Sequence, residues 1–251
     1  MYLETLWVKT TEFDFVSAQI PEEFDNLKIV FVSDIHHGPF SSIERVSELV
    51  NKINEINPEI VIFGGDYVHR GKKYIKPVFQ ELAKVNPKNA KFGVLGNHDY
   101  WDDAVQTAKS MKEANILNIE NNSFTIKQGK DSIKIGGVGD LWENKQDLNA
   151  TTHNISAGNF CILVSHNPDY NERLNTDKID LMLSGHTHGG QVSFFGLWSP
   201  ILPSDYGQKY RYGLIETEKR SIYISSGFGT VTAPVRFFMR PEIVVITLKR
   251  E

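Results

Sequence analysis

Five short polar clusters along the chain carry the residue types from which metal-dependent hydrolytic sites are built. Each cluster contains aspartate, asparagine or histidine and follows an apolar run typical of a β-strand. The clusters are Ser33-Asp34-Ile35-His36, Gly64-Gly65-Asp66, Gly96-Asn97-His98-Asp99, Ser165-His166-Asn167 and Gly185-His186-Thr187-His188-Gly189. Because open α/β sheets keep their sites at the carboxyl ends of their strands, we expect these segments to meet at one edge. The sequence therefore predicts a metal centre there.

The types of ligand indicate which ions such a centre would hold. Carboxylate and imidazole together suit Mn, Fe or Zn, whereas Mg prefers oxygen ligands alone. Asp34 and His36 are two residues apart, so in extended backbone their side chains point to the same side, and His186 and His188 repeat that spacing. Asp66 follows two glycines, which let the backbone turn tightly beside an ion. Each motif alone also fits a polar turn; their joint occurrence favours the metal site.

Length and composition narrow the class of protein. The 251 residues are ample for a sizeable core, and the absence of repeats or low-complexity linkers predicts one domain over residues 1–251. A net charge of −4 argues against a general polyanion-binding surface, so no nucleic-acid partner is expected. Cys161 has no second cysteine to pair with and lies in an apolar run, which predicts a buried thiol. With no long apolar run and no signal-peptide pattern, we expect a cytoplasmic protein; whether an anchor precedes Met1 is left open.

The first half of the chain alternates strand and helix patterns. Residues 6–20 predict an edge strand, and three apolar runs each lead to an amphipathic segment. The expected strands cover residues 28–33, 59–63 and 91–95, and the expected helices cover 42–56, 74–85 and 102–114. Ser41 or Ser42 is the expected N-cap of the first helix, and Asp102 that of the third.

From about residue 116 the pattern changes to short β segments separated by Gly, Asn and Asp turns. The expected segments cover residues 123–128, 132–138, 160–165, 179–183, 190–195, 213–218, 221–226 and 242–248. The sequence thus predicts an α/β first half joined to a β-rich second half.

The five clusters, in this order, resemble the calcineurin-like metallophosphoesterase superfamily, whose pattern is Asp-x-His, Gly-Asp, Gly-Asn-His-Asp/Glu, His and Gly-His-x-His. The resemblance covers residues 34–188. Later segments, among them Gly189-Gly190-Gln191-Val192 and Ser226-Gly227-Phe228-Gly229, are similar to a bacterial phosphohydrolase branch that includes phosphodiesterases and a UDP-2,3-diacylglucosamine pyrophosphatase. The resemblance implies an α/β (α+β) fold, a four-layer α/β/β/α sandwich of two mixed β-sheets flanked by helices.

The resemblance also implies a role for each matching residue. One ion would be held by Asp34, His36, Asp66 and His188, and the other by Asp66, Asn97, His166 and His186, with Asp66 bridging. His98 would act at the outgoing oxygen, and Asp99 would orient His98. Two divalent ions, Mn²⁺ first and Fe, Zn, Mg or Ni as alternatives, would ionise a shared water whose hydroxide attacks phosphorus.

Residues beside the clusters are candidates for substrate contacts. His37 either contacts substrate or lies on the surface. Arg70, next to His69, either holds a phosphate oxygen or is solvated. Arg211 and Arg236 offer positive charge for a second phosphate, since guanidinium forks match phosphate oxygens.

The segment Phe194–Pro203 comes after the last cluster and is too rich in Gly and Pro for a regular element. It is either a loop folded onto the core or an apolar lip, with Phe195 and Trp198 facing acyl chains or a membrane surface. The lip and the branch similarity favour a phosphodiesterase or pyrophosphohydrolase of a lipid- or sugar-linked substrate such as UDP-2,3-diacylglucosamine. The alternatives are a broad phosphodiesterase or nucleotide hydrolase with no lipid link, and a non-catalytic metal-binding scaffold on the same fold. No ligand position is replaced, which favours the enzyme.

Overall fold

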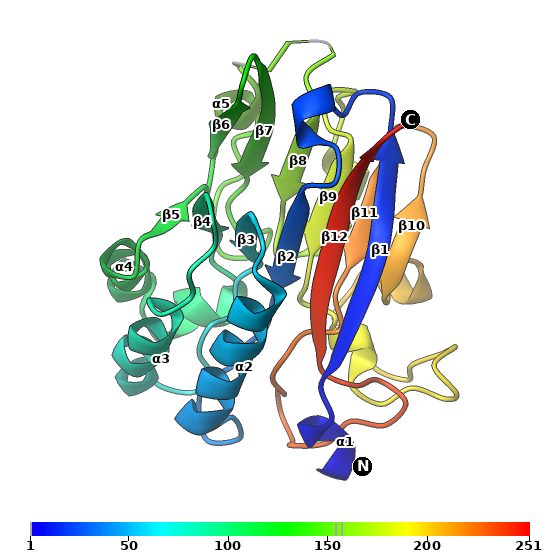
Figure 1. Ribbon diagram of the computed structural model, residues 1–251. Coiled ribbons are helices and arrows are strands. Elements are labelled where there is room, and N and C mark those ends of the chain that lie inside the picture. Colours follow the sequence, from blue (N-terminus) through cyan, green and yellow to red (C-terminus); the bar gives the residue numbers. More distant parts are fainter. Residues whose placement is uncertain (1, 154, 157) are drawn as a thin grey trace.

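The computed structural model describes residues 2–153, 155–156 and 158–251 of the chain. Two β-sheets lie face to face, and helices cover the outer side of the first sheet (Figure 1). Both sheets are mixed, and the buried side chains between them come from strands of each. The expected sandwich of two mixed sheets flanked by helices is therefore confirmed.

The first sheet contains strands from both ends of the chain. They are β1 (Lys9–Ser17), β2 (Lys28–Val32), β3 (Ile60–Phe63), β4 (Ala90–Gly93), β5 (Ile116–Asn118) and β12 (Glu242–Arg250). Their order is β1-β12-β2-β3-β4-β5, which confirms the N-terminal edge strand. From β2 to β5 the strands run parallel, whereas β12 is antiparallel to β2. All four residues of β3 are buried, because helices cover one face of the sheet and the second sheet covers the other.

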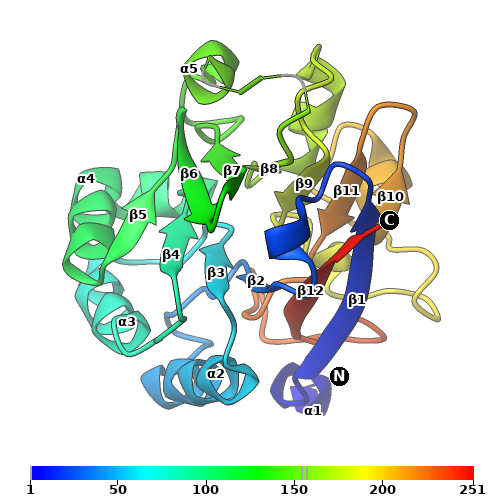
Figure 2. The same ribbon diagram turned by 45° about the horizontal axis from the view of Figure 1, so that its top comes forward.

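Three helices cover the outer face of this sheet (Figure 2). They are α2 (Ile43–Ile56), α3 (Ile75–Leu82) and α4 (Asn97–Glu113). Ser42 is the N-cap of α2, as expected. The third helix begins earlier than expected and has a break at Asp103, whose carboxylate accepts a hydrogen bond from the Gln106 amide at 2.9 Å. The capping residue after the break is therefore Asp103, and the prediction of Asp102 was wrong by one position.

The second sheet is formed by the later strands. They are β6 (Asn122–Gln128), β7 (Asp131–Gly137), β8 (Cys161–Val164), β9 (Leu181–Ser184), β10 (Gly213–Glu216) and β11 (Ser221–Ile224). Their order is β10-β11-β9-β8-β7-β6. The short helix α5 (Leu148–Thr152), which the sequence did not predict, lies on its outer face (Figure 2). The other short helices are α1 (Tyr2–Leu6), η1 (Glu22–Phe24), η2 (Lys72–Tyr74), η3 (Pro168–Arg173), η4 (His188–Gly190) and η5 (Gly207–Tyr210).

The expected strand at residues 190–195 is absent from this described part of the chain. Gly189, Gly190 and Gln191 all have positive φ, so the backbone coils instead of extending. Beyond this coil the chain forms a loop in which the Phe194 amide donates to the Trp198 carbonyl at 2.7 Å.

Two further expectations concern burial. Cys161 is buried in the second sheet, and this burial raises the pKa of its thiol to about 12, so the thiol is an unreactive core group. Among the described residues, no helix has the length and apolar character needed to cross a membrane.

Candidate metal centre

The five polar clusters meet where strands of the two sheets end. Three clusters come after β2, β3 and β4 of the first sheet, and two come after β8 and β9 of the second. Their ligand atoms form buried groups, of which two are Asp34–His36–His188 and Asp34–Asp66–His166, with all ligand atoms of a group within 4.8 Å of one another. The site therefore exists only when the two sheets are packed together.

The first group contains two imidazoles beside a carboxylate. Nε2 of His188 lies 3.3 Å from Oδ1 of Asp34, and Nε2 of His36 lies 3.1 Å from Nε2 of His188. Nε2 of His36 is also 3.5 Å from Oδ2 of Asp66. Three ligand-type atoms thus converge on one small volume beside Asp66, as a bound cation requires.

The second group includes Asp66 itself. Nδ1 of His166 donates to the Gly64 carbonyl at 2.7 Å, and its Nε2 faces Oδ2 of Asp66 at 3.3 Å. Nδ1 of His186 lies 3.0 Å from Oδ1 of Asn97. Such pairs of electron-rich atoms are favourable when a cation lies between them.

Two observations test whether these residues fit metal ions. Nε2 of His166 is buried without a hydrogen-bond partner, although buried polar atoms nearly always have one. A Cβ added at Gly96 would lie 2.2 Å from Oδ1 of Asp66, and one at Gly185 would lie 2.2 Å from Oδ2 of Asp34. Bare glycines therefore leave room for the carboxylates to approach. The donor set and its surroundings fit a binuclear site.

Electrostatics point the same way. Burial lowers the pKa of His36 and His188, and it lowers that of His186 to about 3, so these rings are neutral and keep a lone pair for a metal. Burial also raises the pKa of Asp34 to about 6, although the nearby charge of His166 works in the other direction. At His166 burial works against protonation, but the Asp66 and Asp34 carboxylates outweigh it and raise the pKa. A cation in the centre would add positive charge beside these carboxylates.

The backbone of the ligand loops differs from the expected geometry. Five ligand residues have φ between 47° and 68°, in the left-handed region: Asp34, His36, Asp66, His186 and His188. The extended backbone invoked for the two i, i+2 pairs was therefore wrong, although both pairs converge. Left-handed conformations of residues other than glycine cost about 1 kcal/mol or more each and concentrate at functional sites.

Asp99 has a different task from the one expected. Its carboxylate accepts hydrogen bonds from the main-chain amides of Gly96 at 2.9 Å, Asp66 at 2.8 Å and Tyr67 at 2.9 Å. It therefore ties the loop after β3 to the start of α4. The expectation that it orients the His98 ring is not met, since its hydrogen bonds go to backbone amides.

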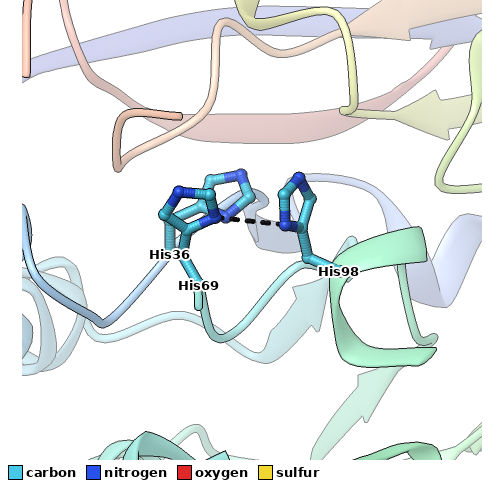
Figure 3. A group of neighbouring side chains, drawn as sticks. All are labelled: His36, His69 and His98. Carbon is cyan, nitrogen blue, oxygen red and sulfur yellow. Dashed lines mark hydrogen bonds between the residues drawn. The ribbon is translucent and has the colours of Figure 1, made fainter. Parts of the chain in front are cut away.

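The ring of His98 is paired with His69 instead (Figure 3). The two Nδ1 atoms are 3.1 Å apart, so one of them carries the shared proton. Burial, followed by the charges of His98 and Arg70, lowers the pKa of His69 to about 4. His36 stands beside the pair, and one ligand atom from each of the three rings lies within 4.8 Å of the others (Figure 3). The sequence left His69 undecided, and the structure places it in the site.

A cavity of about 830 Å³ opens over the candidate metal ligands. Asp66, Asn97, His98, His186 and His188 form its polar floor. Its walls are mostly apolar, with side chains of Trp101, Trp142, Val192, Ile201, Leu202, Val231 and Val235. We call this cavity the chamber. Trp101 lies three residues after His98 on α4, so its place in the chamber could have been inferred from this spacing. No motif near Trp142 indicated that this residue lines the chamber.

The proposed substrate contacts lie in different places. Arg70 lines the chamber. His37 is buried away from it, with Nδ1 bonded to the Ser41 carbonyl at 2.8 Å. Arg211 donates to the Gly196 carbonyl at 2.7 Å and does not line the chamber.

Arg236 also departs from its expected place. Its guanidinium is fully buried and donates to the carbonyls of Ser226 at 2.8 Å and Met239 at 3.0 Å, so it braces the loops behind His188. Burial lowers its pKa to about 9. Phe195 and Trp198 are exposed outside the chamber. Of the six expected substrate contacts, only Arg70 faces the cavity. Tertiary contacts set the positions of the other five, and spacing along the sequence does not reveal them.

Comparison with known proteins decides the family. The model of the family described as calcineurin-like phosphoesterase matches residues 27–190. The chain belongs to this family. It is 34% identical to the uncharacterized metallophosphoesterase YkuE of Bacillus subtilis, over 99% of this chain and 88% of that protein. It is 30% identical to the phosphodiesterase YaeI of Escherichia coli, over 88% of this chain and 82% of that protein.

Solved structures agree at the level of the fold. The NAD nucleotidase NadN of Haemophilus influenzae superposes with a TM-score of 0.55 at 16% identity, over 80% of this chain and 50% of that one. As a calcineurin-like phosphoesterase with buried Asp and His groups, the protein is a metal-dependent phosphoric ester hydrolase.

Proposed function

We propose that this calcineurin-like phosphoesterase cleaves phosphodiesters or pyrophosphates that carry a large apolar group. The observation that carries this proposal is the chamber, a cavity of about 830 Å³. Its mostly apolar walls adjoin the polar floor formed by the proposed metal ligands. A phosphate held at the floor leaves the rest of its substrate against tryptophan and aliphatic side chains. Lipid-linked substrates have that division, and UDP-2,3-diacylglucosamine is one of them. The YaeI phosphodiesterase among the relatives supports diester cleavage.

We propose that Asp34, His36, Asp66 and His188 hold one divalent ion and that Asp66, Asn97, His166 and His186 hold the other, with Mn²⁺ as the first candidate. Bound metal ions lower the pKa of water and neutralise phosphoryl oxygens. Asp66, close to both histidine groups, is placed to be shared.

The remaining residues act on the substrate. His98 faces the chamber, and its partner His69 fixes the ring, so that His98 donates a proton or a hydrogen bond to the outgoing oxygen. Arg70 lies on the chamber wall, where its guanidinium would pair with a second phosphate or another anionic group. Asp99 holds the two loops that carry Asp66 and Asn97 in register.

A chain-length series tests the apolar chamber. Purified protein with Mn²⁺ is assayed on bis-p-nitrophenyl phosphate and on p-nitrophenyl alkyl diesters of increasing alkyl length, with UDP-2,3-diacylglucosamine beside UDP-glucose. We expect kcat/KM to rise with alkyl length, by up to about tenfold for each two carbons that the walls bury. Leu202→Ser should flatten the series, while Leu117→Ser, on the exposed side of β5, should leave it unchanged.

Two results would contradict the proposal. Equal kcat/KM for short and long esters would leave a broad diesterase without an apolar preference. No hydrolysis with any divalent ion, despite stoichiometric metal binding, would favour the scaffold alternative.

A further inference from the structure

A group of large apolar side chains lies exposed beside the chamber. It consists of Phe194, Phe195, Leu197, Trp198, Ile201 and Phe238, and we call it the rim. Phe195, Leu197 and Ile201 are 77–78% exposed. Figure 1 shows the loop after η4 (yellow) and the loop before β12 (orange-red) at the same end of the molecule as α1, and Figure 2 agrees. Contiguous exposed apolar surface marks a docking site for a partner.

The rim is held in shape by specific contacts. The rings of Phe195 and Phe238 join the two loops with centroids 5.5 Å apart, and Phe194 packs on Trp198 at 5.6 Å. Arg211 donates to the Gly196 carbonyl at 2.7 Å and so secures the tip of the first loop.

The backbone at the two loop tips is strained. Phe195 has φ 54° and Phe238 has φ 52°, in the left-handed region that bulky residues rarely occupy. Strain of this kind persists where surrounding structure enforces it, and it holds these two rings out toward solvent.

The rim is continuous with the chamber. Ile201 lines the cavity and is also 78% exposed, and Pro200 beside it lines the cavity too. An apolar group bound at the rim would therefore lie at the edge of the chamber, beside Ile201.

Charge around the rim separates candidate partners. The chain has 31 acidic residues and a net charge of −4, yet residues 191–203 and 229–241 contain neither Asp nor Glu. Their only charges are Arg236, which is buried, and Arg240. The Arg240 guanidinium lies 3.9 Å from the ring centre of Trp7, which is 64% exposed. Aromatic and aliphatic side chains with arginine and no acidic residue are the composition of surfaces that bind anionic bilayers.

We propose that the rim docks on the surface of a lipid bilayer and that the substrate's apolar group enters the chamber from the bilayer along Ile201. The entry of a substrate by this route rests on the proposed function; docking itself does not. A second copy of the chain is the competing occupant of the rim, and the oligomeric state of the protein tests it.

Co-sedimentation with vesicles tests the docking without any turnover. The protein is spun with vesicles of phosphatidylcholine, and with vesicles of phosphatidylcholine and phosphatidylglycerol. We expect binding to both, tighter to the anionic vesicles. The double variant Leu197→Ser/Phe238→Asn should weaken binding by about tenfold or more, since two apolar anchors are lost. Asparagine is chosen at residue 238 because it tolerates positive φ.

A matched control removes as much exposed apolar surface elsewhere. Val105→Ser/Leu214→Ser changes two exposed residues on α4 and β10 and should leave vesicle binding unchanged. Hydrolysis of bis-p-nitrophenyl phosphate by the rim variant should equal that of the wild type, which shows that the variant is folded.

The outcomes separate the two proposals. Wild-type protein that stays in the supernatant at lipid excess, or equal binding by the rim and control variants, overturns docking. So does a dimer on gel filtration that only the rim variant abolishes, because the rim would then belong to a second copy. Vesicle binding with no preference for long-chain esters would leave docking intact while the proposed substrate class fails.

Discussion

The metal centre and the rim share a left-handed backbone conformation, but it directs their side chains in opposite ways. At the centre, left-handed residues such as Asp34 and His188 turn polar side chains inward, where they are buried. At the rim, left-handed Phe195 and Phe238 turn apolar side chains outward. Both inversions go against the usual partition of side chains between core and surface. The comparison suggests that in these two regions local strain fixes side chains for a contact, with an ion at the centre and with the proposed bilayer at the rim.

Removing metal should have the largest effect and should separate the two regions, because only the centre is expected to bind ions. Dialysis against a chelator should abolish hydrolysis of bis-p-nitrophenyl phosphate, and added Mn²⁺ should restore it. With ion at about 100 times its Kd, the holoprotein gains about 2.7 kcal/mol, which raises Tm by roughly 5–10 °C in a chain of this size. Differential scanning calorimetry measures the shift. Activity that survives complete demetallation would contradict the metal centre.

Asp66→Asn should have the next largest effect. The residue contacts both histidine groups, and its loss removes several kcal/mol of transition-state stabilisation, on the order of 10³-fold in kcat. Metal content by mass spectrometry should fall in parallel. Glu218→Gln, an exposed neutralisation of the same type, serves as the control. Full metal content with unchanged kcat would show that Asp66 is not a shared ligand.

His98→Ala should lower kcat by about 10²-fold or more while metal content stays constant, because we propose that this ring acts on the outgoing oxygen of the substrate. A substrate with a good leaving group, such as a p-nitrophenyl ester, should lose less than an alkyl ester, which needs the proton more. His69→Ala should reproduce a smaller part of this loss, since it removes only the partner of Nδ1. Equal losses with both esters would argue against proton donation.

The smallest expected effect concerns stability beside the centre. Burial raises the pKa of Glu120 to about 7, and Tyr100 donates to it at 2.9 Å. The folded protein therefore keeps a proton that the unfolded chain releases above its ordinary pKa of 4.5. The contribution of this group to stability should fall as pH rises from about 4.5 to 7, by at most about 3 kcal/mol. In urea unfolding, Glu120→Gln should flatten this slope, whereas the exposed Glu113→Gln should not. The same slope in Glu120→Gln as in the wild type would contradict the assignment.

Much of the fold was predictable because strong local signals agree with the tertiary structure. The run Ile60–Phe63 is apolar throughout and becomes a strand buried on both faces, and α2 obeys its apolar spacing. The positions that converge on the centre were equally visible, since each cluster comes directly after a strand. One domain over residues 1–251, the individual ligand roles and the cytoplasmic location stay predictions.

The features that the sequence did not reveal depend on partners distant along the chain. The carboxylate of Asp99 binds amides from the loop after β3, and no local pattern encodes that choice. Arg236 is buried because carbonyls of a neighbouring loop surround it. The coil at residues 190–195 arises from tertiary contacts that override a weak strand pattern. The sequence therefore indicated which types of side chain the loops contribute, but not where those side chains point.

The position of β12 has a consequence for how the cell makes this enzyme. This strand, the last along the chain, lies between β1 and β2 and pairs with both. The sheet that carries Asp34 thus stays split during synthesis until residues 242–250 have emerged from the ribosome. Metal acquisition should accordingly follow the emergence of that segment, and nascent chains stalled before it should bind no ion.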